Sequence, residues 1–290
     1  MIGTTSRIQE LWQKALSLSS LEPGQGYDDI GYALCNIVTQ PRLLAESVAV
    51  LEQLEKDAPG ILESLHHISF QSELLHEKSY ADKIISTDVT APIENILATY
   101  GYGFTYQKIA RLEAGFLPLN GARICYIGPS TIPFSALAIH QETRGEVIWF
   151  DSAPERVHIG ASICRKLEEA GIIEQNAITI CLYRNINDIT EALTTWGAPD
   201  LCSSFFDDTD MDTAMLAECL LQAGCKRFLR ATTHGMAQIL YPPMPELLHP
   251  GLRFVKGYIP PHVTDDLSDK GWEKSENLSF MSLALFEPSI

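Results

Sequence analysis

The residues best arranged for chemistry lie between positions 124 and 151, where a strand pattern, a loop, a helix pattern and a second strand pattern follow one another. The apolar run Ile124–Ile127 ends at Gly128, which opens a loop of Pro, Ser and Thr, and the apolar run Val147–Phe150 ends at Asp151. A tight loop between a strand and a helix, with an acid at the next strand's end, is half of a nucleotide-binding βαβ unit. In such a unit the loop's N–H groups face the ligand and the acid accepts the ribose hydroxyls.

Only one glycine stands at the start of this loop. Pro129 and Ser130 follow Gly128 where a dinucleotide site has further glycines, and the second of those glycines lets the backbone approach a pyrophosphate. The loop therefore favours a nucleoside without phosphates, such as S-adenosylmethionine. An ordinary βαβ crossover that binds no ligand is the alternative interpretation.

Composition and charge exclude several classes of function. The chain has 290 residues, 46% of them hydrophobic, so it can bury a sizeable core in one or two domains. Its net charge is −16 and its Lys and Arg residues are scattered, which argues against a nucleic-acid partner. No apolar run approaches the ~20 residues of a membrane span and no signal pattern opens the chain. We therefore expect a cytoplasmic protein without a membrane partner.

The cysteines and histidines lack the spacing of a metal site. The seven cysteines are dispersed, odd in number and without a C-x-x-C pair, so we expect reduced thiols that mostly fill the core. The eight histidines have no ligand spacing with cysteines or acids, so we expect no metal.

The periodicity of the apolar residues changes near residue 118. Before it, apolar residues recur every three to four positions, which is typical of amphipathic helices. After it, β-prone runs alternate with helical patterns. Strands are expected near 123–127, 146–150, 177–182, 200–205, 226–231, 252–258 and 278–286, and helices near 134–142, 154–170, 187–195 and 211–223.

This alternation predicts an α/β fold with a mainly parallel sheet and helices on both faces. Only the polar loop 262–277 separates the last two strands, which predicts an antiparallel hairpin. Seven strands closed in this way are typical of a Rossmann-like, class I methyltransferase-type sheet. We predict two domains, an N-terminal helical bundle domain over residues 1–118 and a Rossmann-like S-adenosylmethionine-binding domain over 119–290, with the site in the cleft between them.

Five segments, in order along residues 70–245, carry a family resemblance. The segment Arg230–Pro243 resembles the R-S-A-H-G-x-x-x-x-L-Y-P stretch of nicotianamine synthases, and Tyr106–Glu113 resembles their Y-x-K-L-x-K-L-E helix. The segment Glu73–Ala81 is similar to E-x-L-L-E-x-H-F-A. Ile127–Pro133 stands where the family has V-G-S-G-P-L-P, and Asp151–Pro154 where it has D-I-D-P. Shorter bacterial relatives, of the staphylopine and pseudopaline type, resemble the chain too.

The resemblance implies a chemistry. These enzymes use S-adenosylmethionine as a co-substrate and transfer its 2-aminobutanoyl arm to an amine, releasing methylthioadenosine. The bacterial relatives transfer one arm to the α-amine of histidine in opine metallophore biosynthesis, and this is the activity we expect. Iterative nicotianamine-type synthesis, an ordinary small-molecule methyltransferase and a non-catalytic ligand-binding protein are the alternatives. The expected partners are a small amino acid, with histidine favoured, and a second copy of the chain in a homodimer.

Such a transfer needs a base for the acceptor ammonium and groups that hold two amino acids. Glu77 is the first candidate for the base, with Glu73 one turn earlier on the same helix face as a substrate-binding residue. A solvated helix face beside Lys78 is the alternative. Tyr102 and Tyr106 are candidate catalytic hydroxyls, and Tyr100 remains a candidate, although tyrosines beside glycines also commonly cap a core.

The nucleoside and the acceptor draw on different segments. Arg230 is expected to clamp a substrate carboxylate, with His234 and Tyr241 shaping the acceptor pocket; a buried structural Arg paired with a strand acid is the alternative. Asp151 is expected on the ribose, although an Asp that ends a strand can also serve a turn. The residues expected to bind the cofactor are Gly128, Pro129, Ser130, Pro133, Asp151, Ser152 and Phe205.

One departure from the usual pattern concerns adenine. The segment Thr179–Arg184 lacks the acid that reads the adenine amino group after the third strand. Backbone groups or Asn185 are expected to do that work instead.

Overall fold

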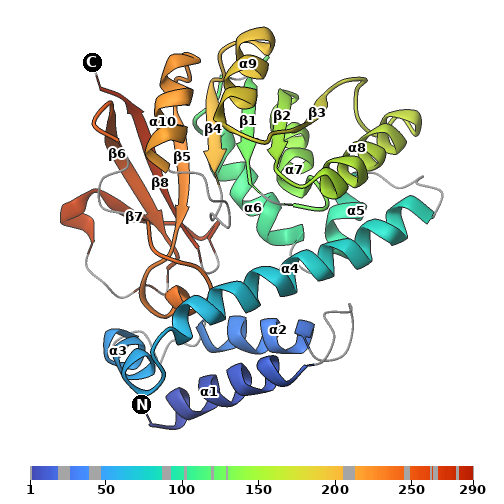
Figure 1. Ribbon diagram of the computed structural model, residues 1–290. Helices are drawn as coiled ribbons and strands as arrows, with labels where there is room; N and C mark the ends of the chain where they lie inside the picture. Colours follow the sequence, from blue (N-terminus) through green and yellow to red (C-terminus); the bar gives the residue numbers. More distant parts are fainter. Residues whose placement is uncertain are drawn as a thin grey trace. The chain divides into compact units, whose positions relative to one another are not determined.

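The computed structural model describes residues 2–18, 27–38, 47–86, 93–100, 103–118, 121–128, 130–204, 213–244, 249–261, 263, 267–278 and 281–289 (Figure 1). Every regular element described before residue 118 is a helix, as the three-to-four spacing predicts. These helices are α1 (Ile2–Ser17), α2 (Tyr27–Val38), α3 (Ser47–Asp57), α4 (Ile61–Ser86), α5 (Ile93–Thr99) and α6 (Gly103–Ala114).

From residue 123 strands and helices alternate. The chain runs through β1 (Arg123–Ile127), α7 (Phe134–Thr143), β2 (Glu146–Asp151), α8 (Pro154–Glu169), β3 (Ile178–Leu182), α9 (Ile186–Trp196), β4 (Leu201–Ser204), α10 (Thr213–Gln222) and β5 (Phe228–Thr232). It ends in the 3₁₀ segment η2 (Gly235–Ile239), β6 (Leu252–Ile259), the 3₁₀ turn η3 (Ser268–Lys270), β7 (Trp272–Lys274) and β8 (Ser282–Pro288).

The strands form one eight-stranded sheet in the order β3-β2-β1-β4-β5-β8-β6-β7. The pairs β1–β2, β2–β3, β1–β4 and β4–β5 are parallel. Because β1 and β4 are neighbours, the strand order reverses there, and the carboxyl ends of these two strands form the switch point at which such sheets bind ligands. The fold is therefore the predicted α/β, Rossmann-like, class I methyltransferase-type sheet.

One strand was missing from the prediction. Residues Trp272–Lys274 form β7, which pairs in parallel with the end of β6, within a segment expected to be only a polar loop. Three residues, two of them exposed, are too short for a period-two pattern to emerge. The last predicted strand, β8, lies between β5 and β6 in the sheet.

The packing divides the chain into two compact units, each made of several segments. The first unit contains 1–79, 232–244 and 257–283, and the second contains 80–231, 245–256 and 284–290. The predicted domain boundary after residue 118 remains a prediction, because the units follow packing and not a single position in the chain.

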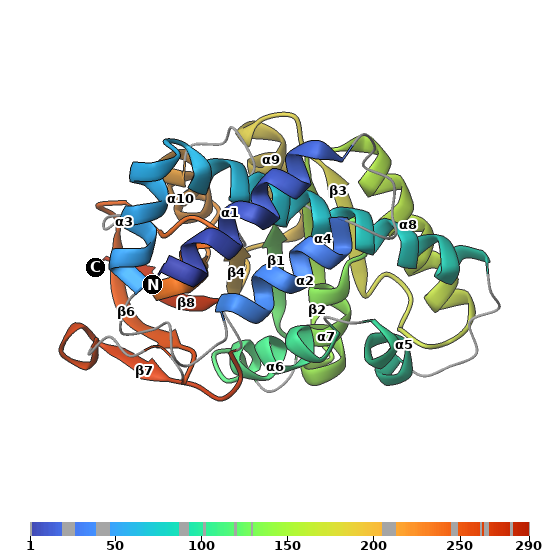
Figure 2. The same ribbon diagram turned by 90° about the horizontal axis from the view of Figure 1, so that it is seen from below.

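The core of the second unit surrounds β1. Residues Ile124–Ile127 are all buried, as expected for a central parallel strand covered on both faces. Helix α7 is buried from Phe134 to His140, and it lies beside α6 (Figure 2). Both helices contribute to one apolar cluster with β1 and β2.

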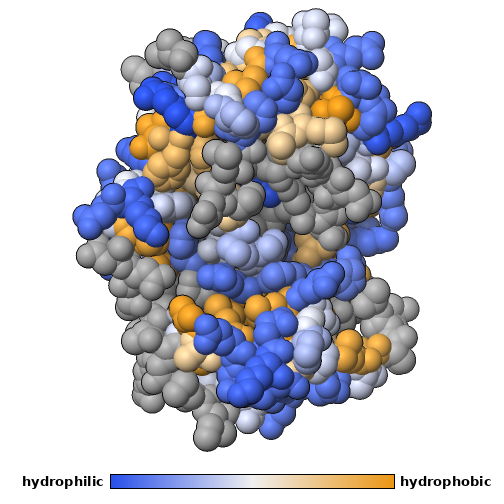
Figure 3. Space-filling view, turned by 60° about the vertical axis from the view of Figure 1, so that its left-hand side comes forward, coloured by the Kyte–Doolittle hydropathy of each residue, from blue (hydrophilic) through white to orange (hydrophobic). Residues whose placement is uncertain are grey.

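On the face in Figure 3, hydrophilic and hydrophobic side chains are interspersed. Within the part of the chain that the structure describes, no helix combines the length and the apolar character needed to cross a membrane.

Candidate functional site

Asp151 ends β2 and is 1% exposed. Its carboxylate accepts hydrogen bonds from the N–H of Ser130, at 3.1 Å, and of Ala153, at 2.8 Å. Arg156, on the first turn of α8, donates from both Nε and Nη2 at 2.8–3.1 Å. The loop after β1 and the first turn of α8 are thus both hydrogen-bonded to Asp151. The same carboxylate also stabilises the turn at residues 151–153.

The loop after β1 begins at a residue that β2 holds in place. Trp149 Nε1 donates to the carbonyl oxygen of Gly128 at 2.9 Å, and the N–H of Gly128 donates to Phe150 O at 3.2 Å. Ser130 is half-buried and Pro133 is the buried N-cap residue of α7, whereas Ser152 is exposed. Gly128, Ser130 and Pro133 follow the carboxyl end of β1, and Ser152 follows that of the neighbouring strand β2, at the edge where the sequence placed the nucleoside.

In the first unit, α4 carries both predicted acids. Glu77 is 2% exposed, so the alternative of a solvated helix face is wrong for this residue. Tyr241 Oη donates to Glu73 Oε2 at 2.6 Å, which joins two residues predicted to bind substrate. Thr233 Oγ1 donates to Tyr241 O at 2.7 Å and keeps the chain after η2 close to the start of that segment.

His234 is half-buried and precedes η2. Its Nδ1 lies 2.9 Å from Ser282 Oγ, and its ring meets Trp272 edge-on at 4.6 Å. In the same unit His66 Nε2 lies 2.7 Å from Gln238 O, so α4 is tied to η2 as well. Burial lowers the pKa of His66, more than its contact with Gln238 raises it, which favours the neutral imidazole.

Arg230 is 6% exposed on β5. Its Nη1 donates to Ser204 Oγ at 2.7 Å, and Ser204 is its register partner on β4. The alternative for Arg230 was a structural pair with a strand acid. The partner in this bond is the hydroxyl group of Ser204, so the bond does not show that pair. The carboxylate clamp stays a prediction.

Tyr106 belongs to an aromatic cluster. Its ring stacks on Tyr100 at 6.3 Å and on Phe134 at 5.7 Å, and Tyr100 stacks on Phe134 at 4.2 Å. Tyr100 is buried and Tyr106 is half-buried. The predicted residues Tyr102, Pro129 and Phe205 lie outside the described residues.

Asn185 has a structural task. Its side chain accepts from the N–H of Asn187 at 2.9 Å, and Asp188 accepts from the N–H of Asn185, which together form the capping box of α9. The side chain proposed to read adenine is thus used at a helix start.

Comparison with known proteins gives the family. The sequence model described as "Nicotianamine synthase protein" matches residues 4–260. The chain belongs to this family. Among curated proteins, no sequence matches significantly.

Solved structures of MtNAS share the fold of this nicotianamine synthase family member. A glutamate-to-glutamine mutant of MtNAS is 13% identical, with 98% of this chain and 97% of the other covered and a TM-score of 0.72. MtNAS in complex with MTA and tNA is 14% identical over 97% of each chain, also with a TM-score of 0.72. The mutant in complex with S-adenosylmethionine is 13% identical, over 98% and 97%, with a TM-score of 0.69.

Sequence reasoning gave no role to two residues that the structure brings into these contacts. Arg156 pairs with Asp151, and Glu113, in the last turn of α6, is fully buried and bonded to two strands. The signal for Arg156 was its place in the first turn after an acid. The signal for Glu113 was a glutamate that the amphipathic pattern of α6 puts on the apolar face.

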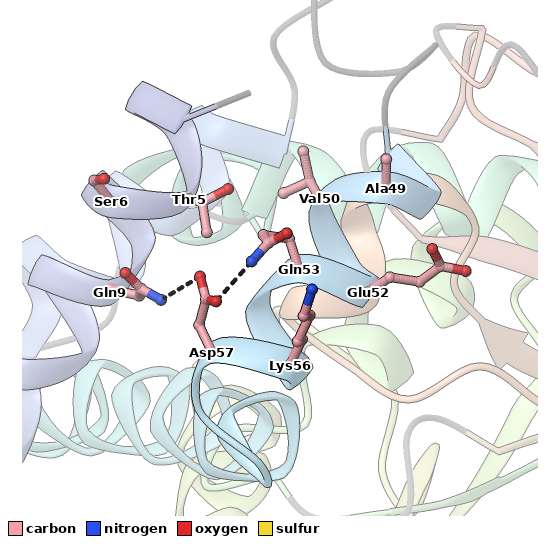
Figure 4. A pocket seen from close by; sticks show the side chains of 9 residues that line it. All are labelled: Thr5, Ser6, Gln9, Ala49, Val50, Glu52, Gln53, Lys56 and Asp57. Carbon is pink, nitrogen blue, oxygen red and sulfur yellow. Dashed lines mark hydrogen bonds between the residues drawn. The ribbon is translucent and has the colours of Figure 1, made fainter.

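A groove of about 580 Å³ between α1 and α3 contains none of the predicted residues (Figure 4). Among the residues that line it, Asp57 accepts from the amides of Gln9 and Gln53, at 3.4 and 2.6 Å. Its acid is thus already bonded to neutral amides, and we assign the groove no role in the reaction. Among the described residues no group of three His, Cys, Asp or Glu side chains is placed to hold a metal ion.

Proposed function

We propose that the chain transfers the 2-aminobutanoyl (3-amino-3-carboxypropyl) arm of S-adenosylmethionine to the α-amine of an amino acid and releases methylthioadenosine. The observation that carries the proposal is Glu77, a glutamate that is 2% exposed. Burying a carboxylate costs free energy of folding, so a chain retains one where it has a use or a partner. Membership of the nicotianamine synthase family supports the same activity.

The proposed reaction is a displacement at carbon. The acceptor nitrogen attacks the arm's carbon next to the sulfonium, the new C–N bond forms as the C–S bond breaks, and the electron pair goes to sulfur, which becomes a neutral thioether. An α-ammonium group has no lone pair, so a base must first take one of its protons. We assign this task to Glu77. Glu73 and Tyr241 hold the acceptor, and the Tyr106 hydroxyl is a further hydrogen-bond partner for it.

The remaining residues orient the co-substrate. In this proposal the loop with Gly128 and Ser130 and the acid Asp151 hold the nucleoside, and Arg230 holds a carboxylate. The arm transfer needs little covalent help, so these positions contribute mainly by orientation. MtNAS has been solved with MTA and its glutamate-to-glutamine mutant with S-adenosylmethionine, and the MTA complex supports arm transfer over methyl transfer.

Histidine is the acceptor we propose, with an opine metallophore as the product's destination. The support is the resemblance to the bacterial one-step relatives. The homodimer, the cytoplasmic location and the lack of metal, nucleic-acid and membrane partners stay predictions.

The nucleoside product shows which C–S bond of S-adenosylmethionine breaks. The protein is incubated with S-adenosylmethionine and with L-histidine, D-histidine or glutamate, and the nucleoside is identified by mass spectrometry. We expect methylthioadenosine with one histidine enantiomer. S-adenosylhomocysteine would show a methyltransferase, and absence of any nucleoside product would favour a binding protein.

Glu77 is tested by Glu77→Gln. The amide keeps the shape but cannot accept a proton, so we expect turnover to fall by about 10²- to 10⁴-fold with S-adenosylmethionine binding retained. The matched control is Glu63→Gln, an exposed glutamate of the same helix, which should keep full turnover. Full turnover in Glu77→Gln would remove its role as base.

A further inference from the structure

Glu113 ends the α6 segment that resembles the family's helix, and the proposed reaction gives it no task. Its side chain is 0% exposed. Tyr126 Oη, from β1, donates to Oε2, and Ser203 Oγ, from β4, donates to Oε1 at 2.8 Å. Both donors are neutral hydroxyls. The acid therefore joins α6 to β1 and β4, and among the described residues no cationic side chain is bonded to it.

From Glu113 the contacts continue toward the predicted nucleoside loop. Tyr126 stacks on Trp149 of β2, with ring centroids 5.4 Å apart and an interplanar angle of 24°. Trp149 Nε1 in turn donates to Gly128 O at 2.9 Å. Two side chains thus separate the carboxyl group of Glu113 from the first residue of the loop.

The second donor leads to another predicted residue. Ser203 is the register partner of Tyr126 on the neighbouring parallel strand, and Ser204 after it accepts from Arg230 Nη1 at 2.7 Å. Both hydrogen-bond donors to Glu113 thus belong to β1 and β4, the strands between which the sheet order reverses. Folds of this kind bind ligands at the carboxyl ends of those strands.

We propose that Glu113 is a positioning residue of the nucleoside site, which fixes the loop after β1 through Tyr126 and Trp149. It touches no substrate and acts only through these two side chains. That this loop binds the nucleoside rests on the proposed function.

The surroundings of Glu113 also favour its protonated form. Burial raises the pKa of Glu113 to about 7, although the hydrogen bonds from Tyr126 and Ser203 lower it in part. Burial and the charge of Glu113 raise the pKa of Tyr126 well above its ordinary value, and burial does the same for the thiol of Cys202 nearby. Of these facing groups, only Glu113 changes its charge between pH 5 and 9.

The raised pKa of Glu113 makes the free energy of unfolding depend on pH. An unfolded glutamate titrates near its ordinary value of 4.5, so between that pH and 7 the folded chain binds more protons than the unfolded one. This contribution to stability is complete below the unfolded pKa and is lost as the pH rises through 7. A side chain that cannot ionise removes the dependence.

The first test follows Trp149 without any ligand. Tryptophan fluorescence is titrated from pH 5 to 9 in the wild type, Glu113→Gln and Trp149→Phe. We expect an inflection near pH 7 that both variants lack, and a melting temperature that falls from pH 5 to 8 in the wild type but less in Glu113→Gln. An inflection that persists in Glu113→Gln overturns the proposal.

The second test separates positioning from a purely structural role. In Tyr126→Phe and Glu113→Gln we expect the KM for S-adenosylmethionine and its Kd by calorimetry to rise about tenfold, because the loop is misplaced, with kcat within twofold. The control is Glu142→Gln, which removes the 3.2 Å surface ion pair between α7 and Arg111 of α6 and should change neither.

Unchanged KM in both variants, or a loss confined to kcat, overturns the positioning role. If Glu113→Gln fails to fold, Tyr126→Phe alone decides, since it removes one hydroxyl and leaves the acid with its second donor. If the wild type binds no S-adenosylmethionine, the proposed function fails, and the fluorescence titration still decides whether Glu113 positions Trp149.

Discussion

Three acids are almost fully buried in the described chain, and their surroundings differ. Asp151 has a guanidinium and two N–H groups, whereas Glu113 has two neutral hydroxyls and Glu77 lies on α4 in the other unit. A buried carboxylate that accepts two hydrogen bonds from one Arg is well compensated for its loss of water. Asp151 is therefore suited to accept hydrogen bonds from a ribose, but its lone pairs are already in use.

Ribose binding at Asp151 requires Arg156 to release at least one oxygen, since each carboxylate oxygen offers about two lone pairs. We therefore expect Asp151→Asn to weaken S-adenosylmethionine binding by about 10- to 100-fold, from the loss of hydrogen bonds to a charged acceptor. Arg156→Gln should leave binding unchanged or tighten it. Calorimetry measures both.

The control for that pair is Arg165→Gln, an exposed Arg on the same helix. If Arg156→Gln weakens binding as much as Asp151→Asn does, the ion pair itself is what the site needs. Asp151 would then serve the turn at the start of α8, the alternative that the sequence left open.

At the scale of elements, the start of α9 gives Asn185 a structural role that competes with contacts to adenine. Its side chain is the N-cap, and removing such a cap costs about 1 kcal/mol of unfolding free energy. We expect Asn185→Ala to lose that amount in urea unfolding while binding S-adenosylmethionine within twofold of the wild type. Asn187→Ala, at an exposed neighbour whose side chain is not the cap, should keep most of the stability.

A tenfold loss of nucleoside affinity in Asn185→Ala, with unfolding unchanged, would contradict the capping role. Asn185 would then be a better candidate for contacts to adenine than the backbone of the loop after β3.

The elements that could be predicted are those long enough for a pattern of apolar residues to show. The strands β1–β6 and β8 and the helices α7–α10 begin and end within a few residues of their predicted bounds, because buried parallel strands are continuous apolar runs. The three residues of β7 carry no such signal. Strand ends also place Gly128 and Asp151 at one edge of the sheet, since parallel strands align there.

Side-chain partners could not be predicted in the same way. Glu73 and Tyr241 are 168 positions apart, and Glu113 and Ser203 are 90 apart. No local pattern encodes such pairs, so only the family resemblance suggested that Glu73 and Tyr241 act together. Arg156 was missed because its place in the first turn of α8 is also explained by an ordinary exposed helix face.

At the scale of the whole molecule, the chain carries a net charge of −16. S-adenosylmethionine has a sulfonium, an ammonium and a carboxylate and is a cation at pH 7, whereas methylthioadenosine is neutral. A negative protein attracts a cationic ligand over a distance that salt shortens, from a Debye length of about 30 Å at 0.01 M to about 8 Å at 0.15 M. The field of the protein therefore favours binding of the co-substrate over retention of the product.

We expect the Kd of S-adenosylmethionine to rise roughly two- to fivefold between 10 and 300 mM NaCl, mainly through a slower association rate, because screening weakens this attraction. The Kd of methylthioadenosine should stay constant over the same range and serves as the control within one protein. Stopped-flow fluorescence with both ligands measures the rates. An equal salt dependence for the two ligands would mean that the net charge of the chain serves its solubility and not the approach of its co-substrate.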